Sequence, residues 1–271
     1  MLVQPYNSDR RPLRRALVTL TLPLLVATIT TATLSAQTPA LTGAARWADT
    51  VRVSIERAVI SGDSRALVAA GAMADRALTA FPNDPLLLHY RGYALYRELI
   101  PEAGSRTETY TERMERAIDL LQRSAAVRPM AESQALLSSC LGALASSGMI
   151  AGMRYGPKSS EARDAAMAAG PRNPRVLLLS AISLWFTPKM WGGGEDKGYA
   201  MMQRAVAAFA SDAPSPPLPS WGQAEAYAWL GQMEVKRGNA AAARDAYAKA
   251  LTLEPGYMWV QRVLMPAVAQ R

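Results

Sequence analysis

Apolar residues recur along this chain three and four positions apart, which is the spacing of one face of a helix. Five such segments occur, at residues 44–59, 85–99, 131–148, 175–187 and 223–237. Each is followed by a second helical segment, and a last apolar stretch covers residues 257–268. No alternating pattern long enough for a strand is found. The pattern predicts an all-α chain of five helical hairpins that ends in a short C-terminal capping helix.

The second helix of each hairpin carries a recurring signature, in which a small residue, an apolar residue and another small residue follow at spacings of four and three. The signature begins at Ala70, Ala117, Ala162, Gly198 and Ala243, so the successive repeats are 47, 45, 36 and 45 residues apart. A helix-turn-helix repeat needs only about 34 residues, and it buries its apolar face by stacking on its neighbours. The surplus residues must therefore lie in loops.

The surplus length falls mainly in three turns within hairpins, at residues 101–110, 149–157 and 188–194. The last two turns carry large apolar side chains, among them Met190 and Trp191. Such residues either pack back onto the helices or contact another molecule. We favour packing back, with Trp191 folded over the edge of the stack near Trp185. The connection at 211–220 contains four prolines and is expected to be a stiff, extended linker.

The clearest repeat lies at residues 224–255. Its first helix presents Tyr227, Leu230 and Gly231, its turn contains Gly238, and its second helix presents Ala243, Tyr247 and Ala250 before Pro255. Small residues at Gly231 and Ala243 allow two helix backbones to approach closely. This segment resembles a tetratricopeptide repeat (TPR), and only Glu234 departs from the family pattern. The resemblance implies a right-handed superhelical stack of TPR-like hairpins, an α-solenoid.

A second resemblance rests on three short segments in the C-terminal half. These are Asn173-Pro174-Arg175, Thr187-Pro188 and Gly192-Gly193-Gly194. The set is similar to that of exported bacterial TPR proteins without an established activity. The resemblance implies export and adds no catalytic residue.

The first 36 residues have the pattern of an export signal. Four arginines between Arg10 and Arg15 precede an apolar run at 16–29. We expect cleavage before Gln37, which leaves a repeat domain of residues 37–271 in the periplasm. The alternative, an uncleaved membrane anchor, is disfavoured by Pro23 and by several threonines in the run. Contact with the membrane is then expected only through this segment, before cleavage.

The charge pattern and the rare residues exclude several classes of function. Removing the signal lowers the formal net charge from +8 to +5, and the remaining charges alternate in sign, so no nucleic-acid partner is expected. The only cysteine, Cys140, cannot form an internal disulfide. The only histidine, His89, cannot build a multi-histidine metal site. We therefore expect no cofactor, no metal and no enzymatic activity, and an enzyme with His89 as its base is the least favoured hypothesis.

Partner binding is expected on the concave face, which the first helix of each hairpin lines. Aligning Gly92 with Gly231 places four residues of the second hairpin there: Leu86, His89, Tyr93 and Tyr96. The same alignment places Glu225 and Gln232 of the last hairpin on this face. An aromatic and largely uncharged groove suits an extended peptide. The competing interpretation is that Tyr93 and Tyr96 are partly core.

The leading functional hypothesis is an exported, non-catalytic scaffold or adaptor that binds another cell-envelope protein or an extended peptide. Met190 and Trp191 of the glycine-rich turn are added to its predicted contact residues. The alternative is a binding protein for a small apolar ligand, held by Tyr93, Tyr96, Met190 and Trp191 in a pocket beneath residues 188–194. The sequence names neither the partner nor the oligomeric state.

Overall fold

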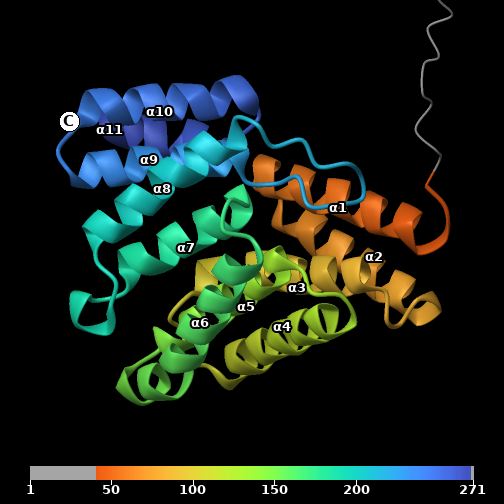
Figure 1. The fold of residues 1–271 in the computed structure, drawn as a ribbon. Coiled ribbons are helices and arrows are strands. Elements are labelled where there is room, and N and C mark those ends of the chain that lie inside the picture. The colour runs from red at the N-terminus through yellow and green to blue at the C-terminus, as the bar shows by residue number, and fades with distance from the viewer. Residues whose placement is uncertain (1–40, 270–271) are drawn as a thin grey trace, which may run out of the picture. The chain divides into compact units, whose positions relative to one another are not determined.

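The computed structural model describes residues 41–269, in which eleven α-helices follow one another without a β-strand (Figure 1). The first ten pair in chain order into five hairpins. They are α1 (Gly43–Ser61) with α2 (Ser64–Ala80), α3 (Pro85–Leu99) with α4 (Glu108–Val127), α5 (Ala131–Ala145) with α6 (Met149–Ala169), α7 (Pro174–Phe186) with α8 (Glu195–Phe209), and α9 (Gln223–Lys236) with α10 (Ala240–Leu253). A π-helical turn, η3 (Val260–Leu264), continues into α11 (Met265–Ala269). The predicted all-α stack of hairpins with a short C-terminal helix is confirmed.

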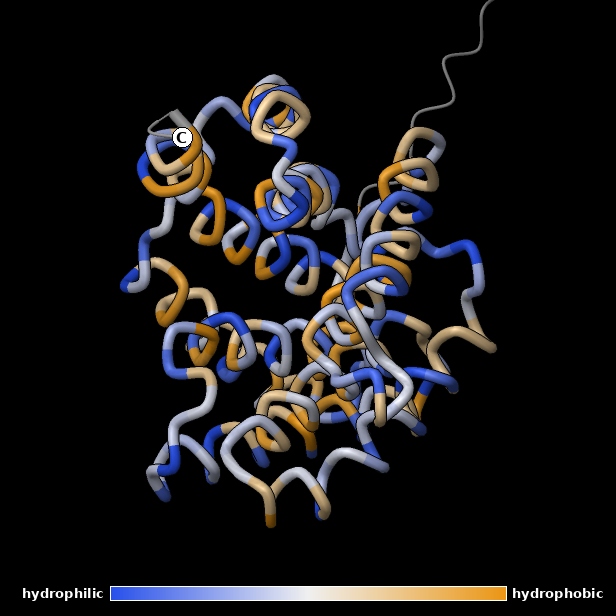
Figure 2. The backbone as a smooth tube through the Cα atoms, turned by 90° about the vertical axis from the view of Figure 1, so that its left-hand side faces the viewer, coloured by the Kyte–Doolittle hydropathy of each residue, from blue (hydrophilic) through white to orange (hydrophobic). Residues whose placement is uncertain are grey.

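The helices bury one face each. Figure 2 shows hydrophobic and hydrophilic residues alternating along the helical turns, as amphipathic helices require. One cluster of buried apolar side chains runs through the first four hairpins into α9, and a second joins α9, α10 and the C-terminal segment. Within residues 41–269 no helix is both long enough and apolar enough to cross a membrane. The export signal predicted for residues 1–36 lies outside the described residues.

Two of the hairpins begin with an N-cap followed by proline. The Asp84 carboxylate accepts hydrogen bonds from the backbone N–H groups of Leu86 and Leu87, at 3.1 and 2.9 Å, and Pro85 opens α3. The Asn173 side chain caps α7 in the same way, ahead of Pro174. The cap accepts hydrogen bonds from first-turn N–H groups that have no acceptor inside the helix. Proline has no backbone N–H, and at the first position of a helix none is needed. Local sequence chemistry thus sets where these helices start.

Within two of the hairpins, the helices approach closely at a glycine. A Cβ atom added to Gly231 would lie 2.2 Å from the Tyr247 ring, and one added to Gly92 would lie 2.8 Å from Leu121 Cγ. Tyr247 and Leu121 occupy the same place in the signature of their second helices. The alignment of Gly92 with Gly231 is therefore correct, and both positions require glycine for close packing.

The loop expected at residues 149–157 is instead the first part of α6, and this expectation was wrong. Gly148, at φ +157°, reverses the chain between α5 and α6, so the connection needs only residues 146–148. Pro157 lies inside α6, where it removes one backbone hydrogen bond. Beside it, Ser138 and Ser159 each donate from Oγ to the other residue's carbonyl at 2.8 Å. These reciprocal bonds fasten α6 to α5 next to the proline.

The last repeat also meets the first. A Cβ atom on Gly62 would lie 3.6 Å from Met258 Cβ, and one on Gly256 would lie 3.9 Å from Ile60 Cγ2. The end of α1 therefore touches the segment that follows α10.

Candidate functional site

The linker between α8 and α9, residues 211–222, is fastened to the first helices of three hairpins, α1, α3 and α7. Its first anchor is Asp212, whose carboxylate accepts two hydrogen bonds from the Arg175 guanidinium of α7, at 3.2 and 2.6 Å. Its second anchor is the Pro217 carbonyl, which accepts a hydrogen bond from the Tyr90 hydroxyl of α3 at 2.5 Å. The predicted extended linker thus lies against the helices expected to line the open binding face.

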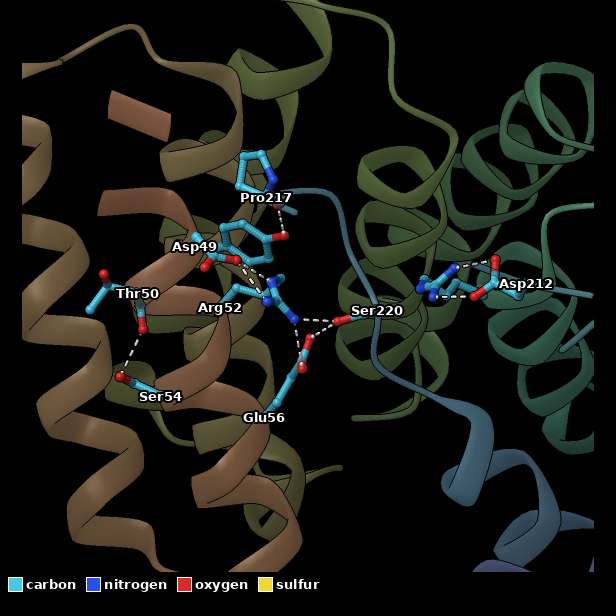
Figure 3. Close-up of polar contacts among 10 residues, drawn as sticks. Asp49, Thr50, Arg52, Ser54, Glu56, Asp212, Pro217 and Ser220 are labelled. Carbon is cyan, nitrogen blue, oxygen red and sulfur yellow. Dashed lines mark hydrogen bonds and ion pairs between the residues drawn. The ribbon is translucent and has the colours of Figure 1, made fainter. Parts of the chain in front are cut away.

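The third anchor is at the end of the linker, beside α1. Ser220 Oγ donates to Glu56 at 2.8 Å and also meets the Arg52 guanidinium, which binds Glu56 in turn (Figure 3). The next residue, Trp221, stacks on Tyr93 of α3, with ring centroids 4.8 Å apart and planes 17° apart. Charge pairs, a hydroxyl bond and an aromatic stack therefore hold the linker in place.

The structure buries most of the binding residues predicted in the second hairpin. Leu86, His89 and Tyr93 are 7%, 0% and 1% exposed, and Tyr96 is half-buried. The competing interpretation, that Tyr93 is a core residue, is correct in this structure, because Trp221 covers its ring. A partner on this face would first have to displace the linker.

In the last hairpin, Glu225 accepts two hydrogen bonds from Arg97 of α3, at 2.8 and 3.0 Å, and lies near Tyr93. Gln232 is half-buried on the same helix. Glu225 and Tyr93 line one pocket, and Tyr96, Met190 and Trp191 lie outside it. That pocket therefore does not unite the four residues named for a small apolar ligand.

His89 belongs to a buried polar chain. Its Nδ1 lies 2.9 Å from Ser133 Oγ, which lies 3.0 Å from Ser124 Oγ, and Ser124 donates to the Pro85 carbonyl at 2.8 Å. Burial, with added repulsion from nearby arginines, lowers the pKa of His89 to about 3. The imidazole is therefore neutral at pH 7 and out of reach of a dissolved substrate. It fastens α3 to α4 and α5, which the sequence alone did not indicate.

His89 should make stability fall in acid. Its folded pKa lies below the unfolded value of about 6.5, so the unfolded chain binds the extra proton, and stability is full above pH 6.5 and declines below it. Between pH 7 and pH 5 this costs about 2 kcal/mol. His89→Gln keeps a hydrogen-bonding group and cannot take up the proton. Urea unfolding at both pH values should show the smaller acid loss in the variant, and equal losses would contradict the assignment.

Two hairpin turns expose large apolar side chains instead of packing them back. Met190 and Trp191, in the short helix η2 (Lys189–Trp191), are 83% and 67% exposed, so the packing expected for them was wrong. The turn closes on its own backbone, because Gly194 N–H donates to the Leu184 carbonyl at 2.9 Å. The place beside Trp185 is taken by Gly198 of α8, where an added Cβ would lie 2.7 Å from the Trp185 backbone.

These residues belong to a larger set, which we call the apolar edge. Its members are exposed at the start of α6 and around the α7–α8 turn: Met149, Ile150, Met153, Phe186, Met190 and Trp191. An exposed apolar group of this size is typical of a contact with another molecule. The sequence pointed to both turns, but it did not show which side chains would face the solvent.

Comparison with known proteins identifies the type of fold. No family model matches the chain, and no curated protein matches its sequence. TTC0263, a TPR protein of Thermus thermophilus, superposes with a TM-score of 0.59 at 18% identity, over 83% of this chain and 99% of its own. The fold is of the TPR type. The chain also superposes on the HusA haemophore of Porphyromonas gingivalis, with a TM-score of 0.60 at 22% identity, over 72% of this chain and 96% of HusA.

Proposed function

We propose that the protein is an exported, non-catalytic TPR scaffold that binds a protein or peptide partner in the cell envelope through its apolar edge. The observation that carries this proposal is the exposure of Met190 and Trp191, together with that of Met149 and Ile150 at the start of α6. The predicted concave-face residues Leu86, His89 and Tyr93 are buried, and Trp221 at the end of the linker stacks on Tyr93, so the apolar edge offers the readier contact. Exposed tryptophan and methionine side chains supply large, adaptable contact area.

Trp191→Ala should remove partner binding and leave the fold intact. Because Trp191 contributes little to the core, its removal should change the free energy of unfolding by no more than about 0.5 kcal/mol. A tryptophan at the centre of an interface contributes about 2 kcal/mol or more, so the affinity should fall at least about thirtyfold. Cross-linking in the cells that produce the protein identifies the partner, and titration with that partner measures the change.

The matched control is Trp47→Ala, because Trp47 is an exposed tryptophan on α1, away from the apolar edge. It should keep the partner's affinity. If both variants bind alike, the apolar edge is not the contact surface. If Trp191→Ala instead unfolds more easily and still binds, the residue has only a structural role.

The second candidate is a binding protein for a flat apolar ligand. The fold shared with HusA, a haemophore, favours it, as do the exposed rings of Phe186 and Trp191. The one histidine, His89, is buried, so the ligand would be held by apolar and aromatic contact. Haem titrated into the purified protein should then quench tryptophan fluorescence saturably, and Trp191→Ala should reduce the amplitude. Absence of saturable quenching would exclude haem as the ligand.

A further inference from the structure

A small pocket lies where α1, α3, the end of the linker and the segment after α10 come together. Its volume is about 150 Å³, and its walls include three carboxylates and three aromatic rings. They belong to Glu56, Glu225, Glu254, Tyr93, Trp221 and Tyr257, and none of the residues that line the pocket is basic. A cavity of this volume accepts a guest of about the size of benzene. The pocket is separate from the apolar edge, so a guest held there is independent of the partner in the proposed function.

The pocket carries an excess of negative charge. Arg52 pairs with Asp49 and Glu56, at 2.7 and 3.1 Å. Arg97 pairs with Glu225. In the described part of the chain no basic side chain pairs with Glu254, and partial burial together with the nearby Glu56 carboxylate raises the pKa of Glu254.

Three carboxylates therefore line the pocket and two of them pair with a guanidinium group, which leaves one negative charge in excess.

The aromatic walls add a second, independent feature. Trp221 is 6% exposed and stacks on Tyr93, and its Nε1–H has no hydrogen-bond partner among residues 41–269. That N–H is shielded from solvent, so a guest in the pocket would contact Trp221 through its ring. Tyr257 supplies a further buried ring. Aromatic rings beside carboxylates attract organic cations, because the ring face is negative.

The carboxylates are not arranged for a metal ion. Over the described range, 41–269, no group of three or more histidine, cysteine, aspartate or glutamate side chains could hold one. Two of the lining carboxylates, Glu56 and Glu225, are also already engaged by arginines. The free carboxylate, Glu254, is left to pair with a cation whose remaining surface is apolar.

We infer that this pocket binds a small organic ammonium ion. Glu254 balances the positive charge, and Trp221 and Tyr257 contact the carbon atoms. Two sources offer this chemistry: a free amine such as choline, and the lysine side chain of a peptide.

Calorimetric titration of the purified protein tests the ligand class. Choline represents the free amine, and Nα-acetyl-lysine N-methylamide, whose ε-ammonium group is free, represents the lysine side chain of a peptide. The uncharged analogue of choline is 3,3-dimethylbutanol. At least one ammonium compound should bind saturably, and choline, if it binds, should bind at least about tenfold more tightly than its uncharged analogue. Binding of the lysine compound alone assigns the pocket to a peptide, and binding of choline assigns it to a free amine. Equal affinity for choline and dimethylbutanol, or no ammonium binding, would overturn the inference.

Variants test the residues. Glu254 is exposed, so Glu254→Gln should fold normally and bind the ammonium compound at least about tenfold more weakly. Glu161→Gln, an exposed carboxylate on α6, is the matched control and should bind as the unaltered protein does. Unchanged affinity in a folded Glu254→Gln variant would refute the role of that carboxylate.

Discussion

Asp212→Ala is expected to lower the free energy of unfolding by about 3 kcal/mol, because it leaves a buried guanidinium without its carboxylate. The Arg175 side chain is only 2% exposed and gives two hydrogen bonds to Asp212, so water cannot replace the lost partner. The substitution also releases the start of the linker from α7. Urea unfolding followed by circular dichroism measures the loss.

Two further variants separate this pair from an ordinary ion pair. Asp164 pairs with Arg163 on α6 and is 73% exposed, so Asp164→Ala should cost less than about 0.5 kcal/mol. In the double variant Arg175→Met with Asp212→Ala no buried charge is left unpaired, and much of the lost stability should return. If Asp212→Ala destabilises the protein no more than Asp164→Ala does, the linker is not held by this contact.

Gly231→Leu is expected to cost about 3 kcal/mol, at the upper end of what overpacking causes. Even a Cβ atom would overlap the Tyr247 ring, which is itself buried and has little room to move. The whole α9–α10 hairpin must open to accept the side chain. Thermal and urea unfolding of the purified variant would show the change.

Gly152→Leu is the matched control for this substitution. Gly152 also lies within a helix, α6, but the atom nearest to the position of its Cβ is the Ala145 carbonyl oxygen at 3.5 Å, an ordinary van der Waals contact. Leucine favours the helix over glycine, so this variant should be as stable as the unaltered protein or more stable. Equal destabilisation by the two substitutions would show that helix packing at Gly231 is not the cause.

The hairpins and their register could be predicted from the sequence because the signals are local. Asp84 and Asn173 start helices through bonds to N–H groups two or three residues away. Gly92 and Gly231 each pair with a signature residue of the very next helix. Contacts of this short range leave a readable spacing in the sequence.

The path of the linker could not be predicted, because its contacts join distant parts of the chain. Tyr90 and Pro217 are 127 residues apart, and Arg52 and Ser220 are 168 apart. Nothing in the proline-rich segment itself says which tyrosine or arginine will meet it. The burial of Tyr93 and the pocket beside it depend on these contacts. The sequence therefore predicted an open groove where the linker in fact lies. The exposure of Trp191 was not predicted, because the place expected for its ring beside Trp185 is occupied by Gly198.

The contact between Ile60 of the first hairpin and Gly256 beyond the last changes how the stack should come apart. An open array of repeats contacts only its neighbours, so its end units fray first and its stability is roughly the sum of neighbouring terms. Here each terminal unit borders on the other, and the Arg97–Glu225 pair ties the second hairpin to the fifth. Loss of one end removes support from the opposite end. Unfolding should therefore be a single cooperative event rather than a progressive loss of repeats from the tips.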